Sequence, residues 1–255
     1  MENKQTNPPT AQENIMGTMA INPLLVKLSI PMMVSMLVQA LYNVVDSIFV
    51  SHVSEGALTA VSLAFSLQNM MIAVGVGTGV GVNALLSKSL GEKDQERANK
   101  TAENGIFLAL CSFAAFFIIG LTCMKPYFYA QTSDVEIAER YLTVCSVFSL
   151  GLFLQTMSEK LLAATGRTNL SMCSQLIGAI VNIVLDPILI FLFGLGVRGA
   201  AIATVLSQAV GAIWIIRFLT GPKTILKLRK ENLKVEWNII LPVLGLGISS
   251  FVMLS

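Results

Sequence analysis

The chain has 255 residues, of which 54% are hydrophobic and only 13% charged, and its formal net charge is +2. Its mean hydropathy of +0.72 is too high for a soluble globular domain and is typical of an integral membrane protein. The small net charge gives no support for nucleic-acid binding, so membrane lipid is the first expected partner.

The N-terminal segment, residues 1–23, is polar and contains Pro8 and Pro9. It lacks the apolar core of a signal peptide. We therefore expect residues 1–23 to form a cytoplasmic tail that is retained.

Six apolar runs that are long enough to cross a bilayer follow the tail, since a spanning helix needs about 20 mostly apolar residues. They are continuous and do not alternate in polarity over segments of about 10 residues, which favours helices over a membrane β-barrel. The expected fold is an all-α integral membrane bundle of six transmembrane helices over residues 24–220. The runs lie at about Leu24–Val50, Ala57–Leu86, Ala98–Met124, Ile137–Ala163, Leu170–Phe193 and Gly199–Leu219.

A basic segment, residues 221–237, separates the sixth run from the start of a seventh. We expect it to be a cytoplasmic linker between two lobes. The seventh run, residues 238–255, stops after about 18 residues, slightly short of the length of a span. These features predict a fragment of a larger protein.

The distribution of basic residues predicts the orientation. An N-terminus in the cytoplasm places 14 of the 17 Lys and Arg residues on the inner side and leaves only Lys125, Arg140 and Arg198 outside. This asymmetry fits the positive-inside rule.

The second run contains the glycine-rich sequence GVGTGVG. Neither the third glycine of a dinucleotide fingerprint nor a P-loop lysine is present, so nucleotide binding is rejected. In a helix, Gly75 and Gly79 form one pair of small residues, and Gly77 and Gly81 form a second pair on a nearly opposite face. Two interpretations stay open: close helix packing on both sides, or a hinge that bends during transport.

Polar residues follow one face of the first run. Asp46 lies seven, four and three positions after Gln39, Tyr42 and Asn43, so the four side chains share a helix face. An aspartate at the membrane centre costs roughly 2.5–3.5 kcal/mol and usually faces a cavity or a partner. Gln39, Tyr42, Asn43 and, in the sixth run, Gln208 are expected either to line a cavity or to form ordinary interhelical hydrogen bonds.

Two other polar residues reach a depth similar to that of Asp46. With about 1.5 Å per residue, Asp46 and Thr204 each lie roughly 7 Å from the outer ends of their runs, and Asp186 lies roughly 10 Å from its own. Asn182 is one turn deeper, on the same face as Asp186.

Two prolines lie inside predicted helices, at Pro31 and Pro187, and both are candidate kinks. Pro187 has no N–H, so it frees the carbonyl of Ile183 close to Asn182 and Asp186. Carboxylate, amide, hydroxyl and carbonyl oxygens are ligands that a hard cation prefers, and they would equally hold a proton. A cation or proton site is therefore predicted, with Na⁺ the one metal considered, at Asp46, Asn182, Asp186 and Thr204. The alternative is that Asp186 only caps or stabilises a kink and that Asp46 faces water on the outer side.

No catalytic set is apparent. The single histidine, His52, lies in a short loop, and no Ser/His/Asp triad can be assembled without it. An intramembrane aspartyl protease would have GxGD around one aspartate, and neither VVDS nor VLDP has it. We expect no enzyme and no cofactor. The cysteines lack CxxC spacing and are expected to be small packing residues; they are Cys111, Cys123, Cys145 and Cys173.

Four stretches resemble the N-terminal lobe of multidrug and toxic compound extrusion (MATE) transporters, close to their bacterial multidrug-efflux branch. They read SIPMMVSMLVQALYNVVDSIFVS, GTGVGVNALLSKSLGEKDQERANK, AATGRTNLSM and VNIVLDPILIFLFGLGVRGAAIATVLSQ. The resemblance implies a bacterial inner-membrane antiporter of twelve helices in two lobes, which exports cationic or amphipathic compounds by alternating access and is driven by Na⁺ or H⁺. It also implies that this sequence is one lobe and that the C-terminal lobe of the same chain is missing. It also implies that the family's N-lobe cation site falls on Asp46, Asn182, Asp186 and Thr204.

Two other functions remain as alternatives. A lipid-linked sugar flippase of the same superfamily would be expected to carry several basic residues for phosphate, but the chain has no Lys or Arg between Lys27 and Lys88, and the fifth run has none. A structural membrane module that transports nothing would not need polar groups at one depth. The substrate and the choice between Na⁺ and H⁺ stay open.

Overall fold

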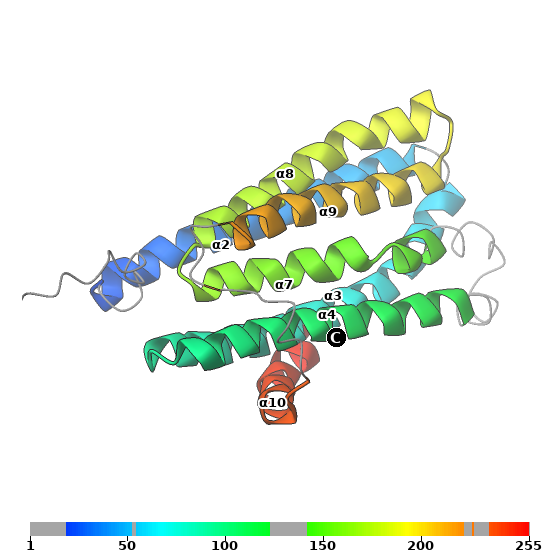
Figure 1. The fold of residues 1–255 in the computed structure, drawn as a ribbon. Helices are drawn as coiled ribbons and strands as arrows, with labels where there is room; N and C mark the ends of the chain where they lie inside the picture. The colour runs from blue at the N-terminus through cyan, green and yellow to red at the C-terminus, as the bar shows by residue number, and fades with distance from the viewer. Residues whose placement is uncertain (1–18, 53–54, 123–141, 222–225, 227–234, 255) are drawn as a thin grey trace, which may run out of the picture.

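Figure 1 shows the fold of the computed structural model, which describes residues 19–52, 55–122, 142–221, 226 and 235–254. This part of the chain is helical and has no β-strand. Its elements are α2 (Ile21–Ser51), α3 (Glu55–Gly91), α4 (Gln95–Thr122), α7 (Leu150–Ala164), α8 (Thr168–Pro187), the π-helix η1 (Ile188–Leu192), α9 (Val197–Leu219) and α10 (Trp237–Leu254).

Five stretches of the described chain are long and apolar enough to cross a membrane. Their outward-facing side chains are mostly apolar, as for Leu37 and Leu192, which suits a surface in contact with lipid. The prediction of an all-α integral membrane bundle is confirmed. The spans are Ile21–Ser51, Leu67–Gly91, Gln95–Thr122, Thr168–Leu192 and Val197–Leu219.

The fourth predicted run differs from the others. Residues 142–147 are helical, a turn follows at 148–149, and α7 begins only at Leu150. The Ser149 hydroxyl donates a hydrogen bond to the Ser146 carbonyl at 2.8 Å, a local contact that competes with continuous helical bonding. With 15 residues, α7 alone is too short to span a bilayer.

Several expectations concern parts of the chain outside the described residues. These are the tail before residue 19, most of the linker at 221–237, and the environment of Cys123. The other three cysteines are free thiols.

The helices form layers around α7 (Figure 1). Helices α2, α8 and α9 pack together on one side of α7, α3 and α4 lie on the other, and α10 packs against α3 and α4 on the face that points away from α8 and α9. We call the end of the bundle where α2 begins the near end, and the end where α2 stops the far end. Since successive helices reverse direction, α3, α7 and α9 all end at the near end.

A buried core fixes the relative positions of α3, α4 and α7. Phe116 of α4 stacks on Phe153 of α7 with ring centroids 5.7 Å apart, and Leu86, Leu161 and Leu162 beside them are fully buried. These aromatic rings and aliphatic side chains form a hydrophobic core, and the more polar helices α2, α8 and α9 lie on the other side of α7 from α3 and α4.

One glycine pair of α3 faces α7. A Cβ atom added at Gly75 would lie 3.4 Å from the Phe153 ring, and one added at Gly79 would lie 2.8 Å from Lys160 Cγ. Side chains of α7 therefore occupy the space that larger residues on α3 would need.

The other glycine pair faces α10. A Cβ atom at Gly77 would lie 3.1 Å from the Gly247 carbonyl oxygen, and one at Gly81 would collide with the Val243 carbonyl oxygen. Backbone thus lies directly on backbone. The two glycine pairs pack on two different helices, as the packing interpretation predicted, and the hinge interpretation stays a prediction.

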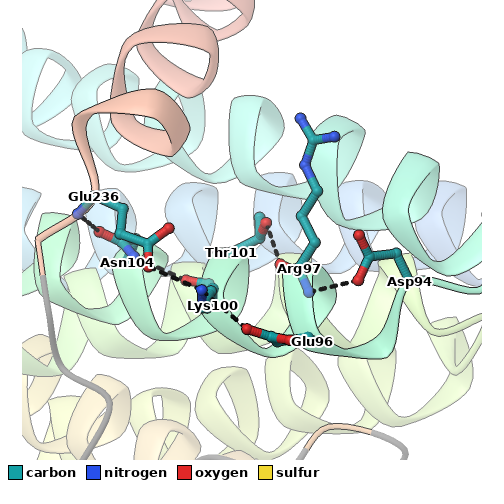
Figure 2. A network of polar contacts seen from close by, with 7 residues as sticks. All are labelled: Asp94, Glu96, Arg97, Lys100, Thr101, Asn104 and Glu236. Atoms are coloured by element: carbon teal, nitrogen blue, oxygen red, sulfur yellow. Dashed lines mark hydrogen bonds and ion pairs between the residues drawn. The ribbon is translucent and has the colours of Figure 1, made fainter.

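Polar contacts hold the start of α10 against α4 at the near end (Figure 2). Lys100 Nζ lies 3.2 Å from Glu236 Oε1 and 3.1 Å from Glu96 Oε1. The Glu236 backbone N–H donates to Asn104 Oδ1 at 3.1 Å, and Asn104 Nδ2 donates to the Lys100 carbonyl at 2.9 Å. Glu236, just before α10, is therefore held to α4 both by an ion pair and by a hydrogen bond of its backbone N–H.

Candidate functional site

A cavity of about 940 Å³ lies among α2, α3, α7, α8 and α9. It extends along most of the bundle, because its wall includes Met32 and Lys160 toward the near end and Ser51 at the far end. Seven of the eight polar residues that the sequence predicted for a cation site or a cavity wall line this cavity: Gln39, Tyr42, Asn43, Asp46, Asn182, Thr204 and Gln208.

The eighth residue, Asp186, lies behind the wall. Its side chain is fully buried, and its Oδ1 accepts a hydrogen bond from Asn182 Nδ2 at 3.4 Å. The two residues are four apart on α8, so the helix itself places the amide and the carboxyl group on one face. Asp46 of α2 is close enough for its charge to act on Asp186.

The helical bonding pattern changes immediately after Asp186. Pro187 ends α8, and η1 continues the chain as a π-helix in which the Phe193 N–H bonds the Ile188 carbonyl at 3.0 Å. Because Pro187 has no N–H, the regular α-helical bond to Ile183 cannot form. Short π-helical turns are frequent at functional sites, and the expected disturbance at Pro187 takes this form.

Thr204 completes the cluster from α9. Its hydroxyl donates to the Ala200 carbonyl at 3.0 Å, and its own carbonyl accepts a hydrogen bond from the Ser207 hydroxyl at 2.7 Å. With its proton engaged in the helix, the Thr204 hydroxyl has only lone pairs to offer to the cavity.

Three buried oxygens of the cluster have no hydrogen-bond partner in the described part of the chain: Asp46 Oδ1, Asn182 Oδ1 and Asp186 Oδ2. A buried acceptor without a partner costs about 1–3 kcal/mol, and more when it is charged. Two carboxyl groups, an amide oxygen and a hydroxyl oxygen from α2, α8 and α9 therefore offer ligands for a hard cation, or acceptors for a proton.

A second polar group in the same cavity is not among the residues predicted from the sequence. Glu159 of α7 lines the wall together with Gln155 and Lys160 of α7 and Gln175 of α8. From the sequence alone, Lys160 is one of the basic residues expected on the inner side. A signal was present, because Gln155 and Glu159 are four apart, the same spacing that drew attention to Asn182 and Asp186.

The sequence profile of the family described as MatE matches residues 31–188. The chain belongs to the MatE family. The matched MatE segment includes Asp46, Asn182 and Asp186, whereas Thr204 and α10 lie beyond it.

Two curated relatives of this chain are named as multidrug proteins. Over 229 residues the chain is 24% identical to the multidrug export protein MepA of Staphylococcus aureus (strain MRSA252), covering 88% of this chain and 51% of that protein. It is 28% identical over 232 residues to the probable multidrug resistance protein NorM of Thermotoga maritima, covering 88% of this chain and 49% of that protein. This MatE chain thus spans about half the length of the curated relatives it matches.

The fold of this MatE chain also occurs in a solved structure. A MOP superfamily transporter from Pyrococcus furiosus, described with a binding pocket of reverse polarity that suggests a different function, matches with a TM-score of 0.91 and 30% identity. The match covers 97% of this chain and 56% of that chain. The described helices therefore have the arrangement of one transporter lobe.

Proposed function

We propose that this chain is one lobe of a secondary active multidrug efflux antiporter, which exports cationic or amphipathic compounds in exchange for Na⁺ or H⁺ by alternating access. Its membrane-spanning fold and its similarity to proteins named as multidrug exporters support this function. The coupling cation or proton binds to Asp46, Asn182, Asp186 and Thr204.

The observation that carries the proposal is the set of three buried oxygens without partners. A cation or proton that enters the cluster supplies the missing partner and removes the repulsion between Asp46 and Asp186. Since Asp46 belongs to α2 and Asp186 to α8, occupancy favours a conformation in which these helices approach each other. A ligand that binds two conformations with different affinity shifts their populations, as an antiporter requires.

The cavity favours a cationic or amphipathic substrate over a lipid phosphate. Its volume of about 940 Å³ lies within the usual range of drug-sized pockets. Among the described lining residues, Asp46 and Glu159 are acidic and Lys160 is the one basic side chain. A flippase for phosphate-linked lipids would be expected to have several basic groups in this wall.

The same proposal covers the location, the orientation and the partners of the protein. The protein works as a multi-pass protein of a bacterial inner membrane, with its N-terminus in the cytoplasm. A second lobe of the same chain closes the open side of the cavity, and lipid contacts the apolar outer faces. It needs no cofactor besides the coupling ion.

Replacing either carboxyl group of the cluster tests this function. In the full-length protein, expressed in a bacterium that lacks its own drug exporters, we expect Asp46→Asn and Asp186→Asn each to lower cationic-dye efflux at least tenfold at normal membrane abundance. Glu92→Gln is the matched control, because Glu92 is exposed just after the end of α3 and its ion pair in the described part of the chain is with Lys88. Full efflux by both variants would show that the cluster is not the coupling site.

The coupling ion requires a separate measurement, because the oxygens suit Na⁺ and H⁺ equally. Dye efflux from vesicles is compared under an imposed sodium gradient and under an imposed pH gradient. The gradient that drives efflux in the wild type, but not in Asp46→Asn, identifies the ion.

A further inference from the structure

Glu159 is held in the cavity wall by two neutral amides. Gln155 Nε2 donates to Glu159 Oε1 at 3.0 Å, and Gln175 Nε2 donates to Glu159 Oε2 at 2.9 Å. The carboxyl group is almost completely buried. Because both oxygens accept N–H bonds, the arrangement suits an ionised carboxylate better than a protonated one, which would direct an O–H at a donor.

Three helices build this group. Gln155 Nε2 also donates to the Ser174 hydroxyl at 3.4 Å, and that hydroxyl donates to the Gly211 carbonyl of α9 at 3.2 Å. A Cβ atom at Gly211 would lie 2.8 Å from Gln155 Nε2, so the amide rests directly on the α9 backbone. The position of Glu159 is therefore fixed by packing from α7, α8 and α9.

The group of Glu159, Gln155 and Gln175 lies apart from the cluster of Asp46, Asn182, Asp186 and Thr204, which we call the Asp46 cluster. Gln175 and Asn182 are seven residues apart on one face of α8, which separates them by about 10 Å along the helix. Gly178 and Ala179 lie between them and also line the cavity. Small side chains at this level leave room for a ligand that is much larger than a metal ion.

The charge of Glu159 is not balanced by a contact. No ion pair found in the described part of the chain involves it, although the neighbouring Lys160 is near enough for its charge to act on the carboxylate. Two amide donors satisfy the oxygens without neutralising them. A buried carboxylate in this state attracts a positive group that can replace lost hydration.

The apolar part of the cavity wall indicates the kind of cation. Ile72 and Val76 of α3, with Leu152 of α7, form an apolar surface in the cavity. Tyr42 of α2 adds an aromatic ring to the same cavity wall, and the charges of Asp46 and Glu159 both act on it. An apolar wall, one aromatic ring and one carboxylate match an organic cation with an apolar body.

We propose that Glu159, held by Gln155 and Gln175, binds the positive group of an amphipathic organic cation, while the coupling ion binds separately at the Asp46 cluster. This assignment rests on the proposed function and adds to it that the two cations occupy different carboxylates of one cavity. Substrate and coupling ion then need not displace each other directly, and their exchange follows from conformational change.

Ligand binding to the purified full-length protein tests the assignment. The probes are a cationic dye of the rhodamine class and an uncharged amphipath of similar size. For Glu159→Gln we expect dye binding to weaken at least tenfold, while binding of the uncharged probe changes less than twofold. Glu159→Asp, which keeps the charge, should bind the dye more tightly than Glu159→Gln, and Glu92→Gln should behave as the wild type.

The response to the coupling ion separates this proposal from the proposed function. Thermal stability is measured with and without Na⁺, and at two pH values. We expect Glu159→Gln to keep the ion-dependent change of the wild type and Asp46→Asn to lose it. If Asp46→Asn keeps that change while Glu159→Gln selectively loses the dye, the coupling site is wrong and the substrate assignment stands.

Two results overturn the substrate assignment. One is dye affinity in Glu159→Gln equal to that of the wild type. The other is an equal loss of both probes in Glu159→Gln and Glu159→Asp together with a lower melting temperature, which would mean that Glu159 serves only to hold α7, α8 and α9 together.

Discussion

Two glycines of α10 differ sharply in what a side chain would meet. A Cβ atom at Gly247 would lie 2.5 Å from the Gly77 carbonyl oxygen, whereas one at Gly245 would meet nothing within 4 Å. Residues two positions apart point to different sides of a helix. A single methyl group is therefore blocked on one side of α10 and free on the other.

This difference gives a prediction with a built-in control. Gly247→Ala should lower the free energy of unfolding by about 1–3 kcal/mol, because the α3 backbone must move away from α10. Gly245→Ala should leave it unchanged or raise it by up to about 1 kcal/mol, since alanine favours the helix. Thermal unfolding of both variants in detergent measures the difference, and equal melting temperatures would mean that α10 does not pack closely on α3.

At the residue scale, the sequence predicted the part of the cavity toward the far end but not the part toward the near end. Asp46, Asn182 and Asp186 stood out because each interrupts a run of apolar residues. Glu159 lies in the segment QTMSEK, close to the end of a run, where a charge is ordinary. Only the packing of α7 against α8 and α9 shows that Glu159 faces inward, and this packing depends on residues far apart in the sequence.

Among the elements, the contact between α4 and the start of α10 combines an ion pair with a backbone hydrogen bond. Lys100 and Glu236 are each about one-third exposed, with side-chain exposures of 35%, so solvent screens much of their attraction. The Asn104 amide adds a hydrogen bond to the Glu236 N–H that does not depend on charge.

A double-mutant cycle measures the charged part of this contact. We expect Lys100→Glu and Glu236→Lys each to destabilise the protein, and the double exchange to recover about 0.5–1 kcal/mol. Chemical unfolding of the four proteins at low and high salt gives the coupling energy, which should shrink at high salt. A coupling energy near zero at low salt would mean that the pair makes no contribution.

The predicted helices agree with the structure where apolar length alone decides. The limits of α2, α3 and α9 lie within five residues of those expected. The break before α7 depends on the Ser149 hydroxyl and on the contacts of the turn, which hydropathy does not register. The π-helix after Pro187 was predictable as a disturbance, because proline removes one N–H, but its form depends on how the following residues find new partners.

For the whole molecule, the all-helical fold was predictable because lipid leaves no other partner for backbone polar groups than the helix itself. The orientation in the membrane follows only from the distribution of Lys and Arg, and it stays a prediction.

Cysteine labelling tests the orientation. In a variant without native cysteines, Glu92→Cys lies at the near end and Leu195→Cys at the far end, where Leu195 is 40% exposed. We expect a membrane-impermeant maleimide to label Leu195→Cys in intact cells and Glu92→Cys only in inside-out vesicles. The reverse pattern would place the N-terminus outside.

The glycine contact between α3 and α10 also has a consequence for the order of synthesis. Gly81 meets Val243, which leaves the ribosome about 160 residues later. At about 5–20 residues per second, that interval is on the order of 10–30 seconds. During this time α3 is already made, and the backbone exposed at Gly77 and Gly81 contacts lipid or another helix in place of α10. A newly made bundle therefore passes through a stage in which the glycine surface of α3 can pack against a helix other than α10. That stage ends when α10 is made and packs on α3.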